Sequence, residues 1–135
     1  MPSEPRARVK TATILVVDDS EDHRRIAARV LASGGYRVAL AKSAEEARLL
    51  LATAPPDAAV LDWNLPGDSG IDLAREIRRD PRLARLPLIM LSVNVRASDQ
   101  VQGLREGEVN AYLTKPVAPA ELLARLKALL ERRRL

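Results

Sequence analysis

The sequence contains no cysteine, no phenylalanine and only one histidine, and its other aromatic residues are one tryptophan and two tyrosines. The lack of cysteine excludes disulfides and thiolate metal ligands. A single histidine provides no cluster of the kind that zinc or iron centres need. Apolar residues still make up 47% of the 135-residue chain, so a hydrophobic core can form, but it must consist mainly of Leu, Val, Ile and Ala.

No apolar run is long enough to span a membrane, and the N-terminus lacks the apolar core of a signal peptide. We therefore expect a cytoplasmic protein without a membrane partner. The net charge of +4 lies largely at the two ends of the chain. A basic surface can favour nucleic acid, but no DNA-reading motif is visible and aromatic rings for base stacking are scarce. We therefore expect no direct nucleic-acid partner.

The length fits one domain. Residues 1–11 are polar and basic and predict a flexible tail, and residues 12–135 form the predicted domain. Short apolar runs predict strands at residues 13–17, 36–40, 58–61, 88–91 and 111–114. Between and after them, amphipathic segments predict helices at 21–33, 43–52, 68–80, 98–106 and from 119 to the C-terminal arginines. This alternation predicts an α/β fold, with a doubly wound five-stranded parallel sheet covered by helices on both faces.

Polar side chains stand where four of these predicted strands end. Asp18 and Asp19 follow the first strand, Asp62 the third, Ser92 the fourth and Lys115 the fifth. Because the carboxyl ends of parallel strands share one edge of a sheet, these residues should line one crevice. Each residue alone is more often a turn former, a helix cap or a surface residue. The hypothesis of a site rests on their occurrence together.

Three carboxylates in one crevice repel each other, and a hard divalent cation such as Mg²⁺ would relieve that repulsion. With a metal present, Asp62 can act as a nucleophile toward phosphorus and form an aspartyl phosphate. The ammonium of Lys115 and the hydroxyl of Ser92 can then neutralise charge on the phosphoryl oxygens. The sequence therefore predicts phosphoryl chemistry on Asp62.

These motifs resemble the receiver domain of two-component response regulators. The resemblance extends from about residue 13 to residue 130 and includes the segments Ile14–Asp19, Leu61–Gly67, Leu91–Ser92 and Tyr112–Pro116. It implies a flavodoxin-like sheet with strand order 2-1-3-4-5 and five helices.

By this resemblance, Asp62 is the phosphoacceptor. Asp19 would bind Mg²⁺ directly, Asp18 would bind it mainly through water, and the backbone carbonyl of Asn64 would complete the metal site.

The resemblance also implies how the state of the acceptor is sensed. Lys115 would pair with Asp62 and then with the phosphate, and Ser92 would move toward the phosphate. Tyr112 would turn inward behind Ser92. A cis peptide bond would join Lys115 to Pro116, as such bonds are almost confined to proline.

The resemblance implies a sensor histidine kinase or a histidine phosphotransfer protein as the phosphodonor. An unidentified protein target would bind the face formed by the fourth helix, fifth strand and fifth helix. We expect a stand-alone signalling switch, since no output domain follows the last predicted helix, and we do not expect a substrate-turnover enzyme. The chain would be a monomer or a phosphorylation-dependent dimer.

Three other functions are considered. A receiver-like interaction or dimerisation module would act without phosphorylation. A Mg²⁺-dependent phosphohydrolase would be expected to carry a second Asp where Asn64 stands. A flavodoxin-like cofactor binder is disfavoured because the acidic segment Asp18–Ser20 would repel a flavin phosphate.

Three residues depart from the family pattern. Val93 replaces a residue that is usually small and should narrow access to Asp62. Glu108 replaces a usual glycine and should reshape the turn before the last strand, and Trp63 is a large residue beside the acceptor. His23 is most simply a surface residue. The alternative hypothesis is that His23, with Arg24 and Ala27, forms the face that docks the donor kinase.

Overall fold

The computed structural model describes residues 11–93 and 108–134. Five parallel strands form one sheet in the order β2-β1-β3-β6-β7, which confirms the predicted order 2-1-3-4-5. The strands are β1 (Thr13–Val17), β2 (Arg37–Ala41), β3 (Ala58–Asp62), β6 (Leu88–Ser92) and β7 (Ala111–Thr114). Four helices are described: α2 (Glu21–Ser33), α3 (Ala44–Thr53), α4 (Gly70–Arg79) and α6 (Pro119–Arg134). The helix predicted at 98–106 and most of the predicted tail lie outside the described residues.

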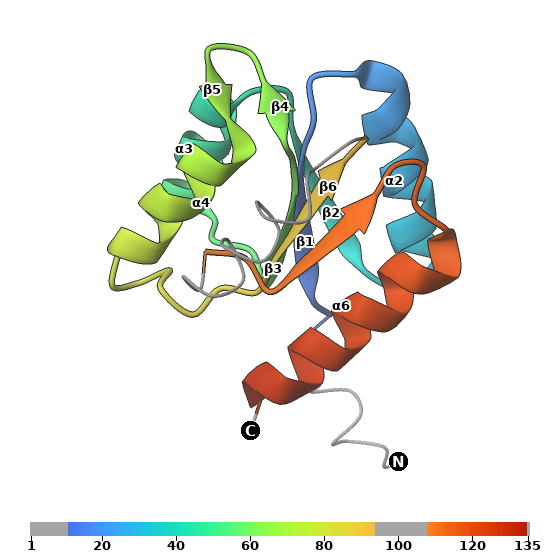
Figure 1. Cartoon of the computed structure of the whole chain (residues 1–135). Helices are drawn as coiled ribbons and strands as arrows, with labels where there is room; N and C mark the ends of the chain where they lie inside the picture. Colours follow the sequence, from blue (N-terminus) through green and yellow to red (C-terminus); the bar gives the residue numbers. More distant parts are fainter. Residues whose placement is uncertain (1–10, 94–107, 135) are drawn as a thin grey trace.

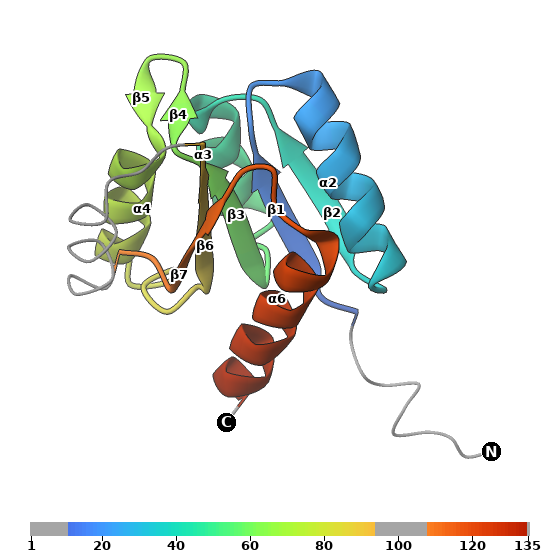
Figure 2. The same cartoon turned by 45° about the vertical axis from the view of Figure 1, so that its right-hand side comes forward.

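The helices cover the two faces of the sheet. Helices α2 and α6 lie on one face, and α3 and α4 lie on the other (Figures 1 and 2). Side chains alternate along the strands, so Ile14 and Val60 face the core under α2 and α6, whereas Leu15 and Leu61 face the core under α3 and α4. Every residue of β3 is buried, as expected for a central strand of a parallel sheet. In the described part of the chain, none of the helices is long and apolar enough to cross a bilayer.

A serine side chain caps the N-terminus of three of the helices, α2, α3 and α4. The hydroxyls of Ser20, Ser43 and Ser69 each accept a hydrogen bond from the backbone N–H three residues later, at 3.1 to 3.2 Å. This is the N-cap interaction that such residues favour. At the start of α3, the Glu46 carboxylate also accepts a hydrogen bond from the N–H of Lys42 at 2.8 Å, so the two side chains form a variant of the capping box.

Several predicted boundaries shift by one residue. Strand β2 begins at Arg37 because the N–H of Tyr36 still donates to the carbonyl of Leu31 at 3.2 Å and closes the end of α2. Strands β3 and β6 extend one residue further than predicted and include Asp62 and Ser92 themselves.

A short antiparallel ribbon between β3 and α4 was not predicted. It consists of β4 (Asn64–Leu65) and β5 (Asp68–Ser69). Gly67 lies in the turn with a φ of 73°, a left-handed conformation that glycine adopts without strain. The N–H of Gly70 then donates to the carbonyl of Trp63 at 2.7 Å, and this bond fixes the start of α4 close to the end of β3.

Candidate functional site

The carboxylates of Asp18, Asp19 and Asp62 meet at one edge of the sheet. One oxygen from each lies within 4.8 Å of the others. Strands β1 and β3 are hydrogen-bonded neighbours, so Asp18, which follows β1, and Asp62, the last residue of β3, are brought together. Asp18 and Asp62 are buried, at 4% and 7% exposure, and Asp19 is exposed.

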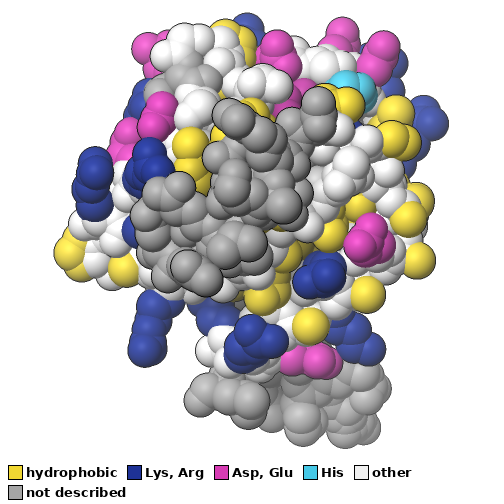
Figure 3. Space-filling model, viewed as in Figure 1, with side chains coloured by type: hydrophobic (Ala, Val, Ile, Leu, Met, Phe, Trp, Pro, Cys, Tyr) yellow, Lys and Arg dark blue, Asp and Glu magenta, His cyan; other side chains and the backbone are white. Residues whose placement is uncertain are grey.

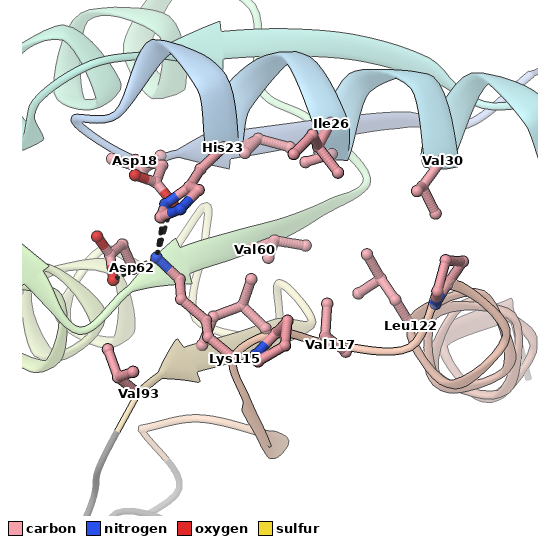
Figure 4. Close-up of a pocket in the computed structure, with 16 residues that line it drawn as sticks. Asp18, His23, Ile26, Val30, Val60, Asp62, Val93, Lys115, Val117 and Leu122 are labelled. Atoms are coloured by element: carbon pink, nitrogen blue, oxygen red, sulfur yellow. Dashed lines mark hydrogen bonds and ion pairs between the residues drawn. The ribbon is translucent and has the colours of Figure 1, made fainter.

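Lys115 joins this cluster from the other half of the sheet. Its backbone N–H donates to the carbonyl of Ser92 at 2.9 Å and continues the pairing of β6 and β7 beyond their ends. Its Nζ then donates to Oδ2 of Asp18 at 3.0 Å and lies 3.2 Å from Oδ1 of Asp62 (Figure 4). The lysine side chain is only 14% exposed, so this ammonium is held among the carboxylates and not in open solvent.

Burial and neighbouring charges act in opposite directions on Asp62 and Lys115. Burial and then the charge of Asp18 raise the pKa of Asp62 above its ordinary value, and Lys115 offsets only part of this effect. Burial would lower the pKa of Lys115, but hydrogen bonding and attraction to Asp18, followed by Asp62, raise its pKa overall. The lysine is therefore a firmly held cation, and the Asp62 carboxylate is in a site with an excess of negative charge.

The donor set of the cluster fits a hard divalent cation. All three side chains offer carboxylate oxygens, which Mg²⁺ prefers over nitrogen or sulfur. Burial and then the charge of Asp18 disfavour the ionised form of Asp62 and raise its pKa, and a bound cation would favour the ionised form. Asn64 lies two residues after Asp62, and its side chain is exposed.

The other predicted site residues lie on or just after the neighbouring strands β6 and β7. Ser92 is buried at the end of β6 and follows Leu91, the residue that pairs with Asp62. Tyr112 is partly buried in β7 and packs against the core under α3 and α4. The peptide bond between Lys115 and Pro116 is cis, which confirms that prediction.

The three residues that depart from the family pattern have distinct surroundings. Val93 is 65% exposed and lines a cavity that also contacts Asp62. The ring of Trp63 lies 6.1 Å from that of Tyr112, at an interplanar angle of 47°. Glu108 is buried, and its Oε2 lies 3.5 Å from Nε of Arg75 on α4. Trp63 is therefore placed to report on changes at both Asp62 and Tyr112.

An apolar cavity of about 380 Å³ adjoins the acidic cluster. Helix α2 forms one wall, and the connection from β7 to α6 forms the other (Figure 4). Its apolar lining includes Ile26, Val30, Val60, Val117 and Leu122.

Two contacts at the edge of the acidic cluster could not be predicted from the sequence. Nδ1 of His23 lies 3.4 Å from Nζ of Lys115, and Nη1 of Arg24 donates to the backbone carbonyl of Asp18 at 2.8 Å. In the space-filling view, the single histidine lies among acidic side chains at the upper rim of the molecule (Figure 3). His23 and Lys115 are 92 residues apart in the chain, so no local pattern could have indicated their contact.

Comparison with known proteins gives consistent matches. The sequence profile of the family described as "Response regulator receiver domain" matches residues 14–127. The chain is 42% identical over 120 residues to the phosphate regulon transcriptional regulatory protein PhoB of Pseudomonas aeruginosa, with 89% of this chain and 52% of that protein covered. It is 42% identical over 119 residues to the response regulator MprA of Mycolicibacterium vanbaalenii, with 88% of this chain and 50% of that protein covered. The chain thus spans about half the length of these curated relatives.

Solved structures agree with the sequence relatives. The receiver domain of the Francisella response regulator 1452 superposes with a TM-score of 0.83 at 28% identity, covering 91% of this chain and 99% of that one. The Vibrio cholerae chemotaxis protein CheY4 superposes with a TM-score of 0.83 at 27% identity, covering 89% and 99%. Because several sequence relatives are named transcriptional regulatory proteins, the comparisons do not support the expectation that nucleic acid is excluded as a partner.

Proposed function

The chain belongs to the response regulator receiver domain family, and on that premise we propose that it is a phosphorylation-activated signalling switch with Asp62 as its phosphoacceptor. The observation that carries the proposal is the position of the Lys115 ammonium, 3.0 Å from Asp18 and 3.2 Å from Asp62. A cation fixed at this place can stabilise negative charge that develops on a phosphoryl group transferred to Asp62.

The proposed donor is a phosphohistidine of a sensor kinase or of a phosphotransfer protein. A carboxylate oxygen of Asp62 attacks the phosphorus atom and forms a new P–O bond. The P–N bond to the donor histidine breaks, its electron pair remains on the imidazole nitrogen, and that nitrogen takes up a proton. The product on Asp62 is an acyl phosphate.

The carboxylates of Asp18, Asp19 and Asp62, with the backbone carbonyl of Asn64, are the proposed ligands of Mg²⁺. When bound, the ion would neutralise charge on the carboxylates and on the incoming phosphoryl oxygens. Lys115 supplies the remaining positive charge from the chain itself, and its raised pKa keeps it protonated for that task.

Phosphorylation adds about two negative charges at a site that is already acidic. We propose that Lys115 and Ser92 reorient toward the phosphoryl oxygens and that Tyr112 changes its packing behind them. The responding surface would comprise β7, α6 and the segment predicted to be helical at 98–106, and a protein target would bind it. A target that prefers the changed surface shifts the equilibrium toward it. The names of the curated relatives favour transcriptional control as the eventual output.

Intact mass after incubation with acetyl phosphate and Mg²⁺ tests the proposal. We expect the wild-type chain to gain one phosphoryl group and Asp62→Asn to gain none. Asp22→Asn removes an exposed carboxylate of α2 and serves as the matched control, so it should still gain one. If no variant gains mass, Mg²⁺-dependent quenching of Trp63 fluorescence separates two cases. Quenching would indicate a receiver that accepts only protein donors, and its absence would favour the phosphate-independent interaction module.

A further inference from the structure

The only histidine of the chain lies at the edge of the acidic cluster, in the first turn of α2 (Figure 4). Its Nδ1 is 3.4 Å from Nζ of Lys115 and 3.6 Å from Oδ2 of Asp18. We propose that His23 is a positioning residue for Lys115, accepting the third N–H of its ammonium and holding it over Asp62. The consequence for phosphoryl transfer rests on the function proposed above, whereas the contact itself does not.

The chemistry of the two side chains determines the direction of this hydrogen bond. A lysine ammonium has three N–H donors and no acceptor. For His23 to accept one of these donors, its Nδ1 must be unprotonated, which places the proton of the neutral imidazole on Nε2. In that tautomer Nδ1 has no proton to share with Asp18, so the 3.6 Å separation between Nδ1 and Oδ2 of Asp18 reflects their common partner Lys115.

The three donors of Lys115 are matched by three acceptors in the described part of the chain. These are Oδ2 of Asp18 at 3.0 Å, Oδ1 of Asp62 at 3.2 Å and Nδ1 of His23 at 3.4 Å. Two of them are carboxylates with other proposed uses, since Asp18 is a candidate metal ligand and Asp62 is the candidate phosphoacceptor. The Nδ1 lone pair of His23 is needed neither for metal binding nor for phosphorylation. His23 is thus the acceptor that stays available to Lys115 when the other two change partners.

The fold holds the imidazole in this position through its backbone. The N–H of His23 donates to Oγ of Ser20 at 3.2 Å, which is the N-cap bond of α2. The next residue, Arg24, donates to the backbone carbonyl of Asp18 at 2.8 Å. The first turn of α2 is therefore tied to Asp18–Ser20, the segment that follows β1. The histidine side chain at this position has few rotatable bonds, so little conformational entropy is lost when it contacts the ammonium.

Two substitutions at His23 distinguish the loss of its hydrogen-bond acceptor from a change in side-chain size. His23→Leu has a similar size and no acceptor, whereas the Oδ1 atom of His23→Asn can take the place of Nδ1. Arg29→Leu, at an exposed position of the same helix, controls for changes in α2. The first measurement is the NMR order parameter of the Lys115 Cε group in metal-free protein, assigned by its loss in Lys115→Met. We expect this order parameter to fall by about a third in His23→Leu and to stay at the wild-type value in His23→Asn and in Arg29→Leu.

The second measurement is the rate of phosphorylation by acetyl phosphate in the presence of Mg²⁺, followed by Trp63 fluorescence. We expect His23→Leu to be slower by about fivefold, as suits a half-exposed hydrogen bond to a charged group. His23→Asn should recover to within about twofold of wild type. Mg²⁺ affinity should be the same in all variants, because the carboxylates are unchanged.

The two measurements fail in different ways. If the wild-type chain takes no phosphoryl group, the proposed function is wrong, and the order parameter still decides whether His23 positions Lys115. An unchanged order parameter in His23→Leu would overturn the positioning role. The positioning role would also be overturned if His23→Asn did not restore the phosphorylation rate, because side-chain size would then be the cause. It would likewise be overturned if Arg29→Leu reproduced the loss of rate, because helix stability would then be the cause.

Discussion

Gly70, the first residue of α4, lies against the backbone of the candidate phosphoacceptor. A Cβ atom added there would lie 2.2 Å from the carbonyl oxygen of Asp62 and 2.9 Å from Sδ of Met90. Non-bonded carbon and oxygen atoms do not approach so closely, and carbon contacts are optimal at about 3.5 to 4.0 Å. In Gly70→Ala, either the start of α4 or the end of β3 must therefore move by about 1 Å.

The energetic consequence can be worked from two opposing contributions. Overpacking in a core destabilises by about 1 to 3 kcal/mol, and a clash with backbone belongs at the upper end because a main chain cannot rotate away. The better helix propensity of alanine offsets at most about 1 kcal/mol. We expect Gly70→Ala to lower the free energy of unfolding by about 2 kcal/mol in urea denaturation followed by circular dichroism. Mg²⁺ affinity should also fall, because Asp62 is displaced.

Gly34→Ala is the matched control. Its added Cβ would lie 2.7 Å from Cδ2 of Leu123, which is the end of a flexible side chain that can turn aside. We expect a change of less than about 1 kcal/mol in stability and none in Mg²⁺ affinity. If the two alanine variants lose equal stability, the reasoning from the backbone clash is wrong.

Two further outcomes are expected. The raised pKa of Asp62, due first to burial and then to Asp18, means that its ionised form destabilises the fold: the stability present below the unfolded-state pKa is lost as the pH rises through the higher folded-state pKa. In metal-free buffer at neutral pH, Asp62→Asn should therefore melt a few degrees above wild type. The difference should shrink as the pH falls through the raised folded-state pKa of Asp62, and it should vanish below 3.8, the ordinary carboxyl pKa. Arg78 donates to two backbone carbonyls and to Oδ1 of Asn110, so Arg78→Met should lower the free energy of unfolding by about 1 to 3 kcal/mol, whereas Arg79→Met, at an exposed position, should change it by less than about 0.5 kcal/mol.

The sheet and the acidic cluster could be predicted because their signals are local. Each strand of the sheet is a short apolar run, and the key polar residue follows it directly, so strand order alone brings Asp18, Asp62 and Lys115 to one edge. The ribbon of β4 and β5 could not be predicted, because two residues on either side of Pro66 and Gly67 are too few to show a period. Its pairing is determined by the turn and not by side-chain alternation.

Other features depend on contacts between distant parts of the chain. A glutamate normally indicates an exposed position, yet Glu108 is 8% exposed. Arg75, on a different element, lies 3.5 Å from its carboxylate and compensates its charge. The contact of His23 with Lys115 is of the same kind, since an exposed helical histidine looks alike in sequence whether or not a lysine faces it. Such pairs become visible only when the fold has placed both partners.

Helix α4 is held at both ends, and this explains why strain at Gly70 should reach Asp62. At its start, the N–H of Gly70 donates to the carbonyl of Trp63 at 2.7 Å. Near its end, Arg78 donates to the carbonyl of Leu86 at 2.7 Å and to Asn110 at 3.1 Å. A helix fixed in this way cannot slide along the sheet to relieve a clash, so the end of β3 has to yield.

A double-mutant cycle tests this account of α4. If Arg78 prevents the helix from moving, its removal lets α4 shift, and part of the clash at Gly70 is then relieved. The variant that combines Gly70→Ala with Arg78→Met should lose less stability than the sum of the single variants, by about 0.5 to 1 kcal/mol. Its Mg²⁺ affinity should lie closer to wild type than that of Gly70→Ala alone, because Asp62 can return toward its position. Additive losses in stability would mean that the strain at Gly70 is absorbed locally and that Arg78 does not restrain the helix.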